Sequence, residues 1–150
     1  MTKTDAARFR RRLLSALYTD AMVLADDMRA VAEYRLAIDA DAGRDPVDRV
    51  LASCEQLRMT TRLMTVLSWL LTWRSIDAGE TDLAAAPRLD PLPRSDIGIT
   101  ASLPDDLRVL SEDGMALYRR AAFLDTAIAG GAMGSTSPAR AIQHRLAAAI

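Results

Sequence analysis

Residue types that do chemistry are scarce in this chain of 150 residues. One histidine, His144, and one cysteine, Cys54, are too few to build a tetrahedral zinc site. The acidic pairs at residues 26–27 and 105–106 are adjacent residues, which point to different sides of a helix and do not suit a di-metal site. No glycine run is followed by the Gly-Lys-Ser/Thr of a phosphate-binding loop. We therefore predict a protein without catalytic residues, cofactor or metal, and not an enzyme.

The overall composition points to a globular helical protein. Half of the residues are hydrophobic, only 5% are aromatic, and the formal net charge is −1. A chain of this length can bury a core without disulfides or metal, and so small a charge creates no field that favours nucleic acid or a membrane. The charged N-terminus lacks an uninterrupted apolar segment before Asp20. Because a single cysteine cannot form an internal disulfide, we predict a reduced, cytoplasmic setting with no membrane partner.

Basic residues gather near the start of the chain, at Lys3, Arg8 and residues 10–12, against the single acidic residue Asp5. Such a cluster is typical of the solvated first turns of a helix. It also keeps open a second function class, a DNA-associated accessory regulator that uses this basic segment. Salt-sensitive DNA binding would favour that class, because phosphate contacts release counterions.

The chain is organised around residues 57–80, which read LRMTTRLMTVLSWLLTWRSIDAGE. Apolar residues cover more than one side of a helix here. One stripe at helical spacing is Met59, Leu63, Val66, Leu70 and Trp73, and a second is Met64, Leu67 and Leu71. A helix with this coverage is a central element that several partners or a second subunit contact. The uncharged run between Arg62 and Arg74 is too short to cross a bilayer.

Two further patterns share this helix. Small hydroxyl residues recur at steps of four and three, at Thr61, Thr65, Ser68, Thr72 and Ser75. Each hydroxyl can bond the carbonyl one turn back, so this hydroxyl seam fits either a structural side of the helix or a groove for a partner helix. Upstream, an apolar stripe of Val47, Val50, Cys54 and Leu57 suggests that Cys54 is a small buried hydrophobe.

Helix and turn signals divide the chain into three long helices. No proline or glycine interrupts residues 5–40, so one long amphipathic helix is allowed there. Gly43, Asp45 and Pro46 mark a short turn into a second, antiparallel helix over residues 46–78. Prolines break residues 79–101, which we interpret as a long crossover along the bundle. A third helix is predicted from Pro104 to residue 129.

These elements predict an all-α fold, an antiparallel three-helix bundle with two long N-terminal helices. The bundle domain is residues 1–129. Residues 130–150 form a tail that is flexible by composition and has a possible short helix over residues 139–150. Because three helices cannot easily cover a helix that is apolar nearly all round, we predict a homodimer that uses part of the first or second helix.

The central motif resembles the signature of an alphaproteobacterial family, the regulator of CtrA degradation family. The residues that carry the resemblance are Leu57, Arg58, Thr60, Thr61, Arg62, Leu63, Met64, Ser68, Trp69, Leu70, Leu71, Arg74 and Glu80. A second, weaker similarity is carried by Leu103, Pro104, Leu107, Leu110, Leu117, Arg119, Leu124 and Asp125. The resemblance spans most of residues 10–129. The middle of the first helix and the proline-rich crossover depart from the family pattern.

The resemblance implies a dimeric three-helix bundle that acts as a non-enzymatic adaptor. Such an adaptor assists delivery of substrates to the ClpXP protease in cell-cycle control, and its implied partners are a ClpX-type unfoldase, substrate proteins and a second copy of itself. The expected partner or dimer surface comprises Leu57, Arg58, Thr61, Arg62, Met64, Ser68, Trp69, Leu70, Trp73 and Arg74. A helical scaffold with other partners is a further alternative.

The last residues of the chain carry a separate prediction. Residues 145–150 are small and apolar apart from Arg145. Unfoldases of the ClpX type often engage short, alanine-rich apolar ends, so we predict a tether or recognition tag at Leu146, Ala149 and Ile150. The alternative is a helix that docks on the bundle through Ile142, Leu146 and Ile150, and the sequence leaves both interpretations open.

Overall fold

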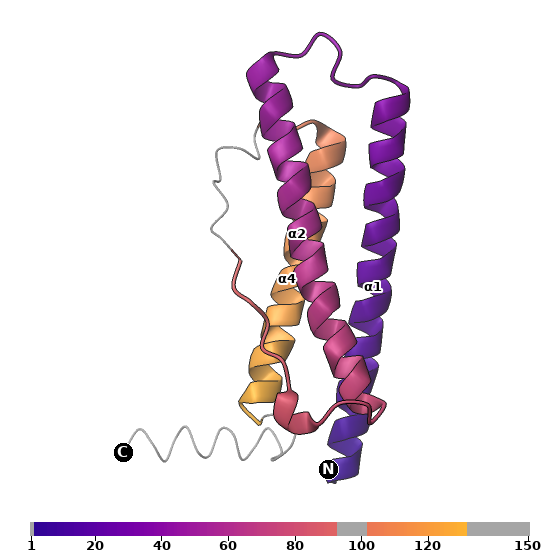
Figure 1. The fold of residues 1–150 in the computed structure, drawn as a ribbon, viewed down its shortest axis with the longest axis vertical. Helices are drawn as coiled ribbons and strands as arrows, with labels where there is room; N and C mark the ends of the chain where they lie inside the picture. Colours follow the sequence, from indigo (N-terminus) through magenta and orange to yellow (C-terminus); the bar gives the residue numbers. More distant parts are fainter. Residues whose placement is uncertain (1, 93–101, 132–150) are drawn as a thin grey trace, which may run out of the picture.

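The computed structural model describes residues 2–92 and 102–131. They form three long helices, α1 (Lys3–Ala37), α2 (Pro46–Asp77) and α4 (Asp105–Ala129), and one short 3-10 helix, η1 (Leu83–Ala85). Within these two ranges there is no strand, and the long helices pack together as a bundle (Figure 1). The predicted all-α, three-helix fold is therefore confirmed.

Local capping residues explain where the helices begin. The Thr2 hydroxyl accepts the backbone N–H of Asp5, and the Asp5 carboxylate accepts the backbone N–H of Thr2, which is a capping box at the start of α1. Asp45 accepts the N–H of Val47 at 2.8 Å before Pro46, the first residue of α2. Gly43 has a positive φ of 74° in the turn between the two helices, where a side chain would add strain.

Contacts between the helices fix their directions. Arg10 near the start of α1 pairs with Asp77 at the end of α2, so these two helices run in opposite directions. Trp69 bonds Asp125 and Glu55 bonds Ser111, both 56 residues apart, so α2 and α4 run in the same direction.

The antiparallel arrangement predicted from the sequence therefore does not extend to α2 and α4. The physical reason is the length of the connection over residues 78–104, which lets the chain return to the end of the bundle where α2 began. The described part of this connection runs along the bundle (Figure 1). Tyr118 donates to the backbone carbonyl of Asp90 at 2.6 Å, and Leu89 packs against the core.

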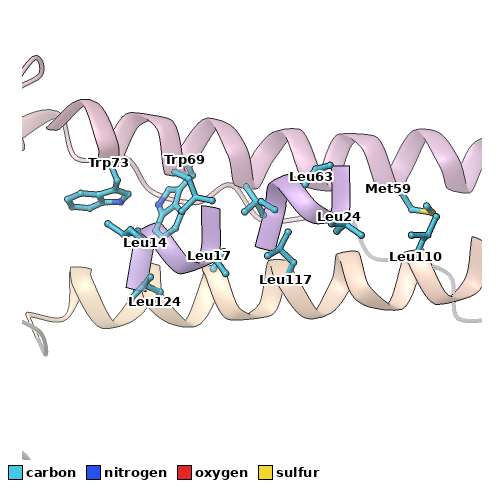
Figure 2. Packing of buried hydrophobic residues seen from close by; sticks show 14 residues of the cluster. Leu14, Leu17, Leu24, Met59, Leu63, Trp69, Trp73, Leu110, Leu117 and Leu124 are labelled. Atoms are coloured by element: carbon cyan, nitrogen blue, oxygen red, sulfur yellow. The ribbon is translucent and has the colours of Figure 1, made fainter. Parts of the chain in front are cut away.

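The core lies between the three long helices, and α2 contributes both of its tryptophans and more of its side chains than either neighbour. Trp69 and Leu70 are buried, at 3% and 0% exposure, as the sequence predicts. Figure 2 shows Trp69 and Trp73 near Leu14 and Leu124 at one end of the core, with Met59 and Leu110 at the other. In the part of the chain that is described, no helix is long and apolar enough to cross a membrane.

The prediction that Cys54 is buried is wrong. Cys54 is exposed, and Val47, Val50 and Leu57 on the same stripe are exposed by 62–70%. The side of α2 that faces the core carries Glu55 and Arg62 instead, both buried. Because these two charges pair with each other inside the bundle, polar residues occupy core positions and the neighbouring apolar stripe faces solvent.

Candidate functional site

The ten residues of α2 expected at a partner or dimer surface divide into two groups. Four of them face the core and are buried: Arg62, Trp69, Leu70 and Trp73. The other six are exposed: Leu57, Arg58, Thr61, Met64, Ser68 and Arg74. Only the second group can contact another protein without unfolding the bundle. The predicted tail residues Leu146, Ala149 and Ile150 lie outside the described residues.

A continuous exposed stripe follows the side of α2 that points away from the core. We call it the outer stripe, and it comprises Val47, Val50, Cys54, Leu57, Thr61, Met64, Ser68 and Leu71. Its members alternate at steps of three and four, the spacing of a coiled-coil seam. The large side chains on it remain open to solvent, with Leu57 at 70%, Met64 at 60% and Leu71 at 51% exposure.

The hydroxyl seam shares Thr61 and Ser68 with the outer stripe, and its first four residues line a groove. The groove has a volume of about 510 Å³ and lies between α2 and residues 87–90 of the crossover. Thr61, Thr65 and Thr72 donate to carbonyls one turn back at 2.9–3.0 Å, so these hydroxyls are satisfied within α2. The structure thus shows self-bonded hydroxyls on the seam and a groove beside them.

A buried polar cluster joins α2 to α4 on the inner side. The Ser111 hydroxyl and the Arg62 guanidinium donate to the same Glu55 oxygen, Oε1, at 2.7 and 2.8 Å. Burial raises the pKa of Glu55, but the hydrogen bonds from Ser111 and Arg62 and the Arg62 charge outweigh burial and lower the pKa below its usual value. The carboxylate is therefore held in its charged form. The cluster fixes the register between two parallel helices and is not accessible to a ligand.

A second polar contact ties the crossover to the bundle. The indole Nε1 of Trp69 donates to Asp125 Oδ1 at 3.0 Å, and Arg88 of the crossover lies 3.0 Å from Asp125 Oδ2. Trp69 therefore acts as a core residue and as one anchor of a three-residue chain. Its presence in the central motif has a structural explanation.

The basic segment at the start of α1 is also partly structural. Arg10 pairs with Asp77 at 2.9 Å, and its guanidinium lies 5.0 Å from the ring centre of Trp73. Arg11 donates to the Asp77 backbone carbonyl at 3.3 Å. Arg8 and Arg12 are exposed. Two of the arginines thus hold the start of α1 against the end of α2.

Among residues 2–92 and 102–131, no three His, Cys, Asp or Glu side chains are grouped so that they could hold a metal ion. Sequence reasoning missed Val47, Val50, Cys54 and Leu71 as surface residues. The signal that could have identified them is the alternation of three- and four-residue steps. It occurs twice in the sequence of α2, once on the buried side and once on the outer stripe.

Neither a curated protein nor a solved structure matches this chain. One family model matches residues 6–150, which includes all of α2 and α4 and nearly all of α1. The chain therefore belongs to the family described as a protein of unknown function (DUF1465).

Proposed function

We propose that this protein is a non-enzymatic adaptor that binds other proteins and assists delivery of substrates to a ClpXP-type protease in the cytoplasm. The observation that carries the proposal is the outer stripe. A central helix that already buries one side in the core presents a second apolar side to solvent over most of its length. Exposed apolar surface of this extent is typical of a protein-binding site.

The spacing of the outer stripe narrows the kind of partner. Side chains that alternate at three and four residues pack best against a second helix, whose side chains insert between them. The adjoining hydroxyl groove has small side chains, which would let a partner backbone approach closely. The resemblance of residues 57–80 to the regulator of CtrA degradation family supports regulated proteolysis as the setting.

The outer stripe also supports the homodimer predicted from the sequence. In a twofold dimer the same patch of each subunit contacts that of the other, so one self-complementary apolar helix face is sufficient to form the interface. We propose that α2 pairs with α2 of a second copy through Leu57 and Met64. The dimer would then cover the stripe when no partner is bound.

The test compares two pairs of substitutions. Leu57→Ser with Met64→Ser removes the centre of the outer stripe, whereas Phe123→Ser with Val109→Ser removes exposed apolar residues of α4. Light scattering at micromolar concentration should show a dimer for the wild type and the α4 pair, and a monomer for the stripe pair. A monomeric wild type would refute the dimer.

The adaptor role is tested separately in a degradation assay reconstituted with a ClpX-type unfoldase, its peptidase and substrates recovered with the tagged protein from cells. Wild type and the α4 pair should accelerate substrate loss, and the stripe pair should not. Equal acceleration by all three proteins would show that the outer stripe is not the delivery surface. If the wild type has no effect on any recovered substrate, the adaptor proposal fails.

A further inference from the structure

The outer stripe consists of two sets of positions that carry side chains of different size. Within each set the positions lie one heptad apart. The smaller side chains stand in one set: Val47, Cys54, Thr61 and Ser68. The larger ones stand in the other set: Val50, Leu57, Met64 and Leu71. From Cys54 onward, small and large side chains therefore alternate along the stripe.

The spacing of the outer stripe reads the same in both directions. From Val47 to Leu71 the steps are three, four, three, four, three, four and three residues, and the centre of the series is level with Met59. A second α2 that runs in the opposite direction about this centre meets the stripe position for position. In that arrangement every position of the smaller set faces a position of the larger set.

We infer that the outer stripe is covered by α2 of a second copy in the antiparallel direction, with the twofold axis level with Met59. The inference rests on the homodimer of the proposed function and adds its direction and its register. The four pairs across the interface are Leu57 with the partner's Thr61, Cys54 with the partner's Met64, Val50 with the partner's Ser68, and Val47 with the partner's Leu71.

Side-chain size favours this direction over the parallel one. In a parallel pair each residue meets its own counterpart, so Leu57 and Met64 would form layers of two large side chains. Thr61 and Ser68 would form layers of two small side chains, which leave space between the helices. The antiparallel pair puts one small and one large side chain in a layer, which keeps the packing even along the interface.

The charges around the outer stripe permit close contact with another copy. Between Leu51 and Thr72 the only exposed charged residue is Arg58, because Glu55 and Arg62 are buried. In the antiparallel register the two Arg58 side chains lie near the twofold axis. Each has Glu55 of its own copy as a counterion at 3.5 Å, so the interface brings together no charge that lacks a partner.

The apolar area of the outer stripe is sufficient for a specific pair. Its five large apolar side chains are exposed by 51–70%. They leave roughly 500 Å² of apolar surface open on each copy, which is near the upper end for a monomer. Two copies together present about 1,000 Å², the size that a specific interface is expected to reach.

Native Cys54 makes the direction testable in the full-length protein, by disulfide formation with copper phenanthroline as oxidant. In the proposed register the two copies of Cys54 lie about 15 Å apart along the interface, so the wild type should not cross-link. Met64→Cys, which keeps Cys54, should give a cross-linked dimer on a non-reducing gel. Positions 54 and 64 are also about 15 Å apart within one α2, so this bond forms only between copies.

Two matched variants identify the register. Adding Cys54→Ser to Met64→Cys should abolish the cross-link, because the two thiols at position 64 then lie about 15 Å apart. Leu71→Cys with Cys54 retained moves the second thiol by one heptad, about 10 Å, and should give no cross-link after the same exposure.

The outcomes separate the register from the dimer itself. A cross-linked wild type would show that the two α2 helices run parallel, and a cross-link for Leu71→Cys but not for Met64→Cys would show a shifted register. Either result would overturn the inference and leave the homodimer intact. A dimer in which none of these variants cross-links uses another surface and also overturns it. A wild type that is monomeric by light scattering would refute the homodimer and, with it, the inference.

Discussion

The inner and outer sides of α2 follow the same alternation of three- and four-residue steps but have opposite surroundings. The inner side runs through Ala52, Glu55, Met59, Arg62, Val66, Trp69 and Trp73, all of them buried. Every residue of the outer stripe is exposed, although the stripe carries valine, leucine and methionine where the inner side carries glutamate and arginine. Hydrophobicity alone therefore does not decide which side of α2 the rest of the chain buries. The inner polar residues find partners in α4, and the outer apolar residues need a partner from elsewhere.

Among substitutions on the inner side, breaking the buried pair of Glu55 and Arg62 should lower the free energy of unfolding most. Replacing Glu55→Gln leaves Arg62 buried without its carboxylate and should lower the free energy of unfolding by about 3–5 kcal/mol, measured by urea denaturation. Replacing both partners, Glu55→Leu with Arg62→Met, should recover most of that loss, because no charge is left unpaired. An unfolding midpoint for Glu55→Gln equal to that of the wild type would contradict the role given to this cluster.

The same cluster predicts a pH dependence. The pKa of Glu55 is lower in the folded state than its ordinary value of 4.5, so its contribution to stability is fully present above pH 4.5. That contribution is lost as the pH falls through the folded-state pKa. The stability difference between wild type and Glu55→Gln should therefore shrink on acidification below pH 4.5, and a constant difference would contradict it.

Two adjacent leucines test the comparison most directly. Leu70 is completely buried and Leu71 is half exposed on the outer stripe. Leu70→Ala should cost about 2–5 kcal/mol because it leaves a cavity in the core. Leu71→Ala should stay within about 0.5 kcal/mol at concentrations where the protein is monomeric. Similar unfolding free energies for the two variants would mean that the sides of α2 are assigned incorrectly.

The two tryptophans separate packing from hydrogen bonding on the inner side. Trp69 donates to buried Asp125, whereas the buried Nε1 of Trp73 has no hydrogen-bond partner within the described residues. Trp69→Phe should therefore be more destabilising than Trp73→Phe by about 1–3 kcal/mol, the cost of an unmade bond to a buried group. Chemical denaturation followed by circular dichroism measures both, and the reverse order would contradict the assignment.

The outer stripe should give the smallest effect on folding. Leu57→Ser and Met64→Ser remove exposed side chains, so each should change the unfolding free energy of the monomer by less than about 0.5 kcal/mol. A loss above 2 kcal/mol in dilute protein would show that the stripe is part of the core. Together with loss of association, a small change would establish that folding and binding use different sides of α2.

Local sequence signals predicted the helices well, because caps and breakers act over a few residues. Asp45 and Pro46 set the start of α2 and Gly79 follows its end, within a residue of the predicted range. The burial of Cys54 was predicted wrongly, because apolar spacing cannot show that Glu55 and Arg62 would neutralise each other in the core.

The relative direction and spacing of the helices could not be predicted from the sequence. The parallel direction of α4 follows from where the crossover ends, and the helical pattern of residues 105–129 is the same in either direction. A groove lined by Met28 and Met59 lies between α1 and α2, in the half of the bundle where these two helices separate. The exposed half of the central motif, Leu57, Thr61 and Met64, was predicted as surface from the resemblance together with the excess of apolar positions.

The shared direction of α2 and α4 has a consequence for the order of folding. Residues 38–45 join α1 to α2, whereas residues 78–104 must close before Trp69 can reach Asp125. The longer closure costs about 1 kcal/mol more in chain entropy, so we expect the α1–α2 hairpin to form first and α4 to join late. Substitutions in the core of α4, such as Leu117→Ala, should then accelerate unfolding much more than they slow refolding. The helix that packs last, α4, is therefore the one that determines the unfolding rate and so the lifetime of the folded state.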